Sequence, residues 1–349
     1  MLRYYTRACN FYYGQQSKIL VKNKKSLPLH NIKEISFDQI EIITRNSKKK
    51  IFINQVKKLP VKLQKKINFD LKKITSNKKS FCNLKFNSIP NILGILNLTP
   101  DSFSDGGKFN THNKASKQIS NMINSGADII DVGGESTRPG SETIDPKTEW
   151  KRIEKILKNF KKKYEKICLS IDTRKFDIMI KSIRYGADLI NDVSGFNYDP
   201  YSLLKLNNYD TSKVLHHMQG TPTTMQINPK YENVLLDIYD FFERKIKNIS
   251  NNKKIILDPG IGFGKNLKHN LTLISKISLF HSLGFPILIG TSRKRFINQI
   301  SGNYDSVDRT GGTLASVLFL LSQGVQIFRI HNVKEIKQGI LVFEKINEK

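Results

Sequence analysis

From residue 92 onward, hydrophobic and polar positions repeat one unit: a short apolar run, a polar loop, and a stretch with apolar residues at helical spacing. The apolar runs occupy 92–97, 128–134, 167–172, 188–193, 213–218, 254–260, 286–292 and 326–331. Examples of the helical stretches are 115–125, 146–164, 176–185, 235–249, 271–283 and 312–323. Eight strand units in about 250 residues predict an α/β fold of the (β/α)8 TIM barrel type. An open doubly wound sheet is the alternative, but it usually begins with a GxGxxG turn, which this sequence lacks.

The first 88 residues follow a different pattern. Apolar alternation at 35–45 and 48–56 favours strands, an amphipathic stretch at 59–74 favours a helix, and 75–80 has the composition of a linker. We therefore expect a small strand-containing cap at 1–88, without a chemical motif, followed by a barrel domain at 89–349.

The net charge of +28 is concentrated in this extension, since residues 1–90 hold 21 lysines and arginines against 4 acidic residues. A nucleic-acid-binding arm is one explanation, and a composition rich in lysine and asparagine is the other. The lysines stand among isoleucines and asparagines with few arginines, whereas phosphate-reading surfaces favour arginine and interleaved aromatic residues. We favour the compositional explanation and expect no specific nucleic acid partner.

Cysteine usage and apolar runs restrict the class of protein further. Cys9, Cys82 and Cys168 lie far apart without CxxC spacing, which indicates neither a disulfide framework nor a zinc site. No run approaches about 18 apolar residues, so no transmembrane helix is expected. Residues 1–14 lack the apolar region of a secretory signal, and an organellar transit peptide remains an alternative to the cytoplasmic location that we expect.

Polar residues stand at or just after the ends of the predicted strands, which meet at one mouth of a barrel. Each could be a turn former or a loop cap, but together they predict a ligand site: Asn97, Asp131, Asp172, Asn191, His217, Asp258, Lys294, Arg329 and His331. Carboxylates and amides suit a flat heterocycle with several N–H donors, such as a 2-amino-4-oxopyrimidine. Arg329 and His331 lie two residues apart on one strand face and suit a phosphate. We expect the heterocycle beside Asp172, Asn191, Asp258 and Lys294, and the anion beside Asn97, Arg329 and His331.

A series of motifs carries a family resemblance. NLTPDSFSDGG (97–107) and IIDVGGESTRPG (129–140) are followed by SIDT, INDVSG, HHMQG, LDPGIGFGKN, TSRK and RIHNV. From about residue 92 to the end, the chain resembles the dihydropteroate synthases, the sulfonamide targets of folate biosynthesis. The resemblance implies a Mg²⁺-dependent transferase that condenses 6-hydroxymethyl-7,8-dihydropterin diphosphate with 4-aminobenzoate to give 7,8-dihydropteroate and pyrophosphate.

The resemblance also implies roles for individual residues. Pterin-binding positions are Asp172, Asn191, Asp258 and Lys294, and diphosphate-binding positions are Asn97, Thr137, Arg138, Arg329 and His331. Asn97 matches the Mg²⁺ ligand, and Phe103, Pro139 and Ser292 match the aminobenzoate pocket. Lys294, Arg329 and His331 are expected to act in catalysis, and the protein is expected to be a homodimer. His216 departs from the pattern, because the family places a methionine in the apolar floor near the pterin.

Two other functions remain open. A pterin-binding methyltransferase barrel would share the Asp and Asn contacts, but it needs no diphosphate pocket, so Arg329, His331 and the TPDSFSDGG loop favour the synthase. A basic nucleic-acid-binding protein with a relic barrel would show salt-sensitive binding and no pterin turnover. A fused pyrophosphokinase would need more length than the first 88 residues provide.

Overall fold

The computed structural model describes residues 3–82, 84–86, 90–99, 108–137, 140–249, 254–302 and 305–348. Within these ranges, eight parallel strands form one sheet in the order β10-β9-β8-β7-β6-β5-β12-β11. A bridge between Leu257 and Ile287 brings the two edges together, and the Leu257 N–H donates to the Pro286 carbonyl at 2.9 Å. The sheet therefore closes into a barrel, which confirms the predicted TIM fold. The strands are β5 (Asn91–Asn97), β6 (Ile129–Gly133), β7 (Cys168–Asp172), β8 (Leu189–Asp192), β9 (Ser212–His216), β10 (Ile255–Asp258), β11 (Leu288–Ile289) and β12 (Ile327–Ile330).

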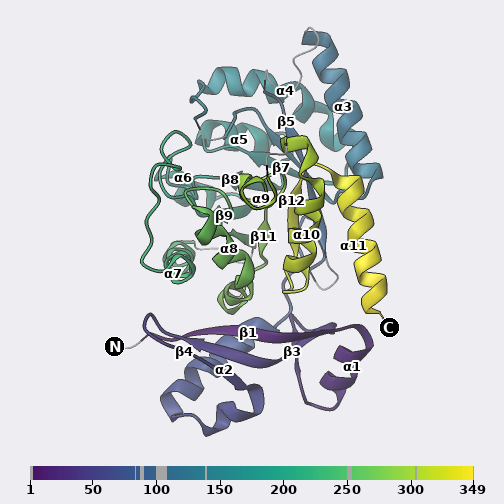
Figure 1. Ribbon diagram of the computed structural model, residues 1–349. Coiled ribbons are helices and arrows are strands. Elements are labelled where there is room, and N and C mark those ends of the chain that lie inside the picture. The colour runs from purple at the N-terminus through teal and green to yellow at the C-terminus, as the bar shows by residue number, and fades with distance from the viewer. Residues whose placement is uncertain are drawn as a thin grey trace.

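Helices surround the barrel on the outside (Figure 1). Their apolar sides pack on alternate strand residues such as Leu169, Ile171 and Ile190, which are fully buried. These helices are α3 (Lys108–Asn124), α4 (Pro146–Lys163), α5 (Phe176–Arg184), α6 (Ser202–Leu206), α7 (Val234–Lys247), α8 (Leu267–Ser275), the 3-10 helix η4 (Ile277–Leu283), α9 (Arg295–Ser301), α10 (Thr310–Leu321) and α11 (Val333–Asn347).

The other strand residues point into the barrel, and they change from apolar to polar along its axis. Cys168 of β7 is buried in the barrel interior, and Ser170 and Asp172 follow it on the same strand face. Phe81, Leu84 and Phe86 pack against the apolar layer and fill the end opposite the mouth. The alternation thus separates a closed apolar end from a polar open end.

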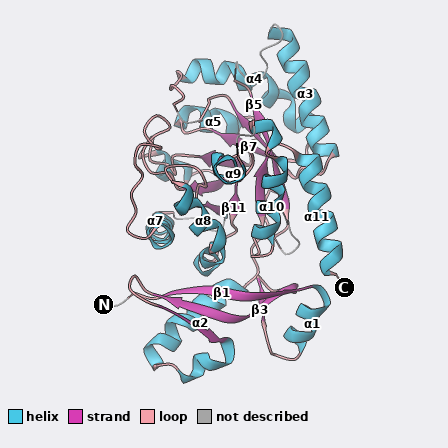
Figure 2. Cartoon of the chain, in the orientation of Figure 1, coloured by secondary structure: helices cyan, strands magenta, loops and turns pink. Residues whose placement is uncertain are grey.

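The N-terminal extension forms an antiparallel sheet of β1 (Tyr5–Tyr13), β2 (Leu27–Leu29), β3 (Ile32–Ile43) and β4 (Lys48–Phe52). It also contains α1 (Gly14–Lys22), η1 (Ile53–Lys58) and α2 (Val61–Thr75), and Figure 2 shows its strands beneath the barrel. The predicted strands and helix of this region are present, whereas β1 and α1 were not predicted. The extension contacts η4, where His30 Nε2 lies 3.1 Å from His281 Nδ1, and the turn before β12, where His30 Nδ1 lies 2.8 Å from Gln326 Nε2.

The extension therefore covers the amino end of the barrel, away from the mouth. Tyr5 and Ile43 are buried in the same cluster as barrel residues, so the two parts share apolar packing. The domain boundary at 88/89 stays a prediction. No helix in the described ranges is long and apolar enough to cross a membrane.

Candidate functional site

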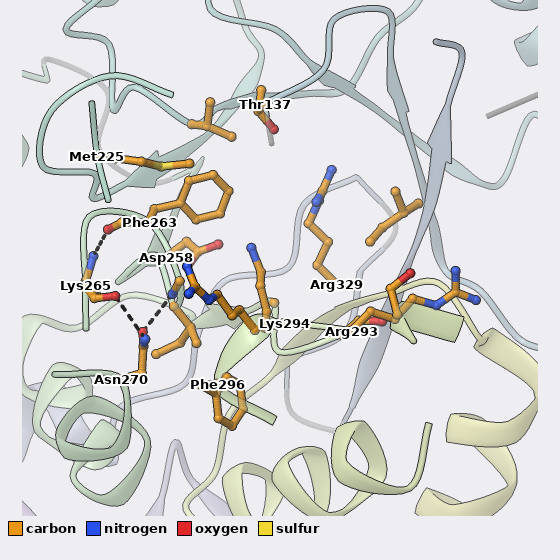
Figure 3. Close-up of a pocket in the computed structure, with 18 of the residues that line it drawn as sticks. Thr137, Met225, Asp258, Phe263, Lys265, Asn270, Arg293, Lys294, Phe296 and Arg329 are labelled. Carbon is orange, nitrogen blue, oxygen red and sulfur yellow. Dashed lines mark hydrogen bonds between the residues drawn. The ribbon is translucent and has the colours of Figure 1, made fainter. Parts of the chain in front are cut away.

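A cavity of about 840 Å³ opens at the carboxyl ends of the barrel strands (Figure 3). Nine of the predicted site residues that the structure describes line it, and Asp131 and His217 do not: the nine are Asn97, Thr137, Asp172, Asn191, Asp258, Ser292, Lys294, Arg329 and His331. Phe103, Arg138 and Pro139 lie outside the described residues. The structure therefore brings together, in one cavity, side chains that are up to 234 positions apart in the sequence, from Asn97 to His331.

A buried ion-pair cluster joins the two halves of the cavity. Arg329 donates through Nε to Asp131 Oδ2 and through Nη2 to Asp172 Oδ2, both at 2.7 Å. Asp131 also accepts from Ser170 Oγ at 2.6 Å and from Asn191 Nδ2 at 3.1 Å. The sequence analysis predicted separate sides for the heterocycle and for the anion. In the structure, Arg329 of the predicted anion side binds Asp172, which was assigned to the heterocycle. The two sides are electrostatically connected.

Asp131 was expected at the mouth and instead lies beneath it. The strand register pairs Asp131 with Ser170 and Gly133 with Asp172, so Asp131 is one layer deeper than Asp172. It is fully buried and is not among the residues lining the cavity. Its function in this arrangement is to orient Arg329 and Asn191.

Asp172 and Asn191 each present one oxygen without a protein partner. Asp172 Oδ1 and Asn191 Oδ1 are buried and accept no hydrogen bond from the described residues. Burial raises the pKa of the Asp172 carboxyl to about 7, against the opposing effect of Arg329. An unpaired buried acceptor costs about 1–3 kcal/mol, so these oxygens are suited to N–H groups of a ligand.

Asp258 and Lys294 lie near each other in the same cavity (Figure 3). Asp258 Oδ1 accepts the Gly260 N–H at 2.8 Å, and burial raises the pKa of its carboxyl to about 6. Burial, followed by the charge of Arg329, lowers the pKa of Lys294 to about 8. The Lys294 ammonium lies 3.9 Å from the centre of the Phe263 ring, close enough for a cation–π contact.

His216, the last residue of strand β9, and His217, which follows it, show that one sequence assignment was wrong. His216 lines the cavity, whereas His217, which was expected there, packs between the rings of Phe241 and Tyr231. On β9, Val214 faces the barrel interior, and a period of two places His216 on the same face. His217 therefore points outward.

Ser292, which was predicted to contact 4-aminobenzoate, is in contact with His331. Ser292 Oγ lies 2.9 Å from His331 Nδ1 and also accepts the His331 backbone N–H at 3.2 Å. These bonds fix the end of β12 against the residues that follow β11. A ligand that reaches Ser292 would thus also contact His331.

The segment after β10 supplies cavity residues that the sequence reasoning did not select. Lys265 is buried and donates to the Phe263 carbonyl at 2.8 Å, and Asn270 Oδ1 accepts the Gly262 N–H at 2.8 Å. These bonds position the Phe263 ring at the cavity wall (Figure 3). The glycine at every second position of GIGFG could have indicated this segment. These glycines have positive φ and allow the tight turn.

The loop after β6, which carries Thr137, is anchored by a buried ion-pair network. Glu135 accepts from Arg174 Nε at 2.9 Å and from Lys175 Nζ at 2.7 Å, and Lys175 also binds Glu149 at 2.6 Å. These side chains are nearly inaccessible to solvent. The loop therefore leaves the barrel in a fixed direction.

Comparison with known proteins gives one family. The family model described as pterin binding enzyme matches residues 93–331. The dihydropteroate synthase of Escherichia coli K12 is 40% identical over 261 residues, covering 74% of this chain and 92% of that protein. The Yersinia pestis dihydropteroate synthase, solved in a sulfonamide drug complex, has a TM-score of 0.69 and 37% identity, covering 74% of this chain and 95% of that one. The Xanthomonas albilineans dihydropteroate synthase, solved with 4-aminobenzoic acid, has a TM-score of 0.69 and 31% identity, covering 74% and 94%.

Proposed function

Because the chain belongs to the pterin binding enzyme family, among the dihydropteroate synthases, we propose that its cavity is the active site of that transfer reaction. The substrates are 6-hydroxymethyl-7,8-dihydropterin diphosphate and 4-aminobenzoate, and the products are 7,8-dihydropteroate and pyrophosphate. The observation that carries this proposal is the convergence of nine described site residues on one cavity.

The pterin ring binds between Asp172, Asn191 and Asp258. The unpaired oxygens of Asp172 and Asn191 accept N–H groups of the ring, and Asp258 accepts from the pyrimidine edge. Lys294 lies beside Asp258 and donates to ring acceptors. Dihydropteroate synthases solved with pteroic acid and with 7,8-dihydropteroate, from Clostridium difficile and Xanthomonas albilineans, support a pterin ligand for this family.

The diphosphate binds at the other wall, beside Asn97, Thr137, Arg329 and His331, with Arg138 from the same loop as Thr137. A guanidinium has five N–H donors, and the bonds of Arg329 to Asp131 and Asp172 use two of them. The remaining donors are free to bind phosphate oxygens. Asp131 and Asp172 hold Arg329 in place before the substrate arrives, so little reorganisation is needed.

The residues fit a Mg²⁺ ion that is bound together with the diphosphate. The described residues contain no group of three or more His, Cys, Asp or Glu side chains that could hold a metal by themselves. Mg²⁺ commonly takes one or two protein oxygens together with substrate phosphates and water. Asn97 provides such an oxygen at the cavity edge and would hold the ion. Bound there, Mg²⁺ supplies charge neutralisation for the diphosphate.

The reaction breaks the bond between the pterin methylene carbon and the diphosphate oxygen, and the electron pair leaves with pyrophosphate. Arg329 and His331 stabilise that departing charge. Asp172 and Asp258, when ionised, favour the positive charge that develops on the methylene and the ring. The amine of 4-aminobenzoate attacks the methylene without prior deprotonation and then loses one proton. Phe103, Pro139 and Ser292 form its pocket in this proposal.

A homodimer belongs to the same proposal. The outer face formed by α10 and α11 exposes the large apolar residues Phe319, Leu341, Val342 and Ile346. A face of this kind supports association of two copies. Sedimentation equilibrium would measure the mass in solution. The cytoplasmic location stays a prediction.

Chromatographic detection of dihydropteroate tests the activity itself. The purified chain should form the product from both substrates, and Arg329→Lys should lower kcat at least about 100-fold, because lysine cannot hold Asp131, Asp172 and the diphosphate at once. Lys181→Arg, on the exposed face of α5, is the matched control and should leave kcat unchanged. Absence of product from the wild-type chain would refute the proposal.

A further inference from the structure

His216 occupies a tight slot in the floor of the cavity. Its Nδ1 lies 2.7 Å from the Val193 carbonyl, and the Phe263 ring meets the imidazole edge-on with centroids 4.6 Å apart. On a third side, a Cβ added to Gly260 would lie 2.9 Å from His216 Cε1, so the glycine backbone packs directly against the ring. The orientation of the imidazole is therefore fixed by contacts on three sides.

The hydrogen bond to Val193 determines the tautomer. A carbonyl oxygen can only accept, so Nδ1 must carry the hydrogen. Burial, together with the charges of Lys265, Lys294 and Arg329, lowers the pKa of His216 well below its ordinary value. The neutral ring with Nδ1–H leaves a lone pair on Nε2, which makes Nε2 a hydrogen-bond acceptor.

A second acceptor lies opposite this atom. His216 Nε2 is 3.9 Å from Asp258 Oδ2, and neither atom has a hydrogen bond within the described part of the chain. The other oxygen of Asp258 is already used by the Gly260 N–H at 2.8 Å. Both residues line the cavity. Two acceptors that face each other need hydrogens from a third group. A ligand bound in the cavity can donate them.

We propose that His216 Nε2 and Asp258 Oδ2 together accept the two N–H bonds of the exocyclic 2-amino group of the pterin. If an amine nitrogen lies about 2.9 Å from both atoms, the angle Nε2···N···Oδ2 at that nitrogen is about 85°, given the 3.9 Å separation of the two acceptors. Each N–H···acceptor angle would then be about 155°, within the favourable range. The inference rests on the proposed function for the identity of the ligand.

This arrangement makes His216 a specificity-determining residue. The carboxylate alone could accept one N–H and tolerate other donors, whereas the pair requires two hydrogens on one nitrogen. A ligand with a hydrogen at ring position 2 would cover His216 Nε2 without donating to it, and a ligand with an oxo group there would add a third acceptor. The site therefore selects ligands with an amino group at the 2-position of the ring. The neutral His216 contributes to this selectivity together with the charged Asp258.

Calorimetric titration of the full chain with 6-hydroxymethylpterin and with its 2-desamino analogue tests the proposal. The ratio of the two dissociation constants is the readout. His216→Met, whose thioether sulfur accepts hydrogen bonds only weakly, should lower the ratio about 3- to 10-fold, mainly by weakening pterin binding. His216→Gln, whose amide oxygen can take the place of Nε2, should restore the preference. His217→Gln, at the adjacent residue outside the cavity, is the control and should keep the wild-type ratio.

Nitrogen-15 NMR of the wild-type chain provides a reading that needs no variant. The Nε2 resonance of His216 should shift upfield on addition of the pterin and not on addition of the desamino analogue. An unchanged ratio in H216M, or equal weakening of both ligands, would overturn the inference, as would an unmoved Nε2 resonance. A wild-type chain that binds neither ligand would instead overturn the proposed function, and this inference with it.

Discussion

Two buried carboxylates control the charge of the pterin cavity. Burial raises the pKa of Asp172 to about 7 and that of Asp258 to about 6. A carboxyl whose pKa is raised is ionised only above that value, and only the ionised form can accept N–H groups with both oxygens. The charge that the pterin meets therefore depends on pH across the neutral range.

Pterin affinity should accordingly fall as the pH drops. We expect calorimetry to give the tightest binding near pH 8, where both carboxyls are ionised and Lys294 begins to lose its proton, and then a loss of about tenfold per pH unit below the pKa of each carboxyl that becomes protonated. Asp258→Asn should weaken binding at pH 8 and remove the part of the decline near pH 6. A wild-type affinity that does not change between pH 5 and 8 would contradict these ionisation states.

Sequence reasoning found most cavity residues because strands of a barrel end at one mouth. From the strand pattern it placed His217 at the mouth, which was wrong, because two adjacent histidines differ only in the strand face they occupy; only the family resemblance placed His216 near the pterin. It also could not place Asp131, whose depth depends on the register between β6 and β7. Lys265 gave little signal, since its contacts to Phe263 and His217 form only after the glycine-rich segment has folded.

At the scale of elements, the loop after β6 is held by the charge network of Glu135, Glu149, Arg174 and Lys175. Removing one member of a buried ion pair leaves its partner uncompensated and costs about 3–5 kcal/mol. Lys175→Met should lower the free energy of unfolding by about that amount in urea denaturation, because both glutamates lose a bond. Lys181→Met, on the exposed face of helix α5, which begins directly after Lys175, should have little effect. Equal stabilities would show that the network is not a significant anchor.

The predicted aminobenzoate walls Phe103 and Pro139, which lie outside the described residues, follow Asn97 and Thr137 closely in the sequence. We predict that these segments form the pocket only with the diphosphate and Mg²⁺ as partners, because ordering each residue costs about 1–2 kcal/mol. 4-Aminobenzoate should therefore bind weakly to the free protein and much more tightly once pterin, pyrophosphate and Mg²⁺ are present. Phe103→Ala should raise KM for 4-aminobenzoate and spare the affinity for pterin diphosphate. Tight binding to the free protein would mean that the pocket is preformed.

The barrel elements were predictable because each buried strand is a short apolar run between turn residues. The strand β1 was not, since Asn10 adopts a φ of 55° and interrupts the alternation of buried and exposed positions. Helices α6, α9 and α11 were not among the helical stretches named from the sequence, and α6 and α9 have only five and seven residues. Short or irregular elements form here because tertiary packing holds them.

At the scale of the whole molecule, the N-terminal extension packs against the barrel at the end opposite the mouth. The ring of Tyr5 meets Tyr239 of α7 edge-on at 5.2 Å, and Gln326 before β12 lies 2.8 Å from His30 Nδ1. Arg45 adds ion pairs to Glu232, Asp237 and Asp240. The extension thus contributes stability and part of its basic charge is paired within the molecule.

Deleting residues 1–76 should therefore lower the melting temperature, because it exposes the buried residues of η4 and removes the contact between His30 and His281. The deletion retains Phe81, Leu84 and Phe86, which close the barrel. The Michaelis constants of the folded fraction should match those of the full chain, because the cavity lies at the other end. A truncated protein with a native circular dichroism spectrum but no turnover would show that the extension contributes to the active site.

The central claim is that this cavity transfers a pterin methylene from diphosphate to an arylamine. A coupled assay of pyrophosphate release by the purified full chain tests it most directly, with 4-aminobenzoate and Mg²⁺ present or omitted in all four combinations. We predict rapid release, equimolar with dihydropteroate, only when both are present. Release at the same rate without 4-aminobenzoate, or no release in any combination, would contradict the claim.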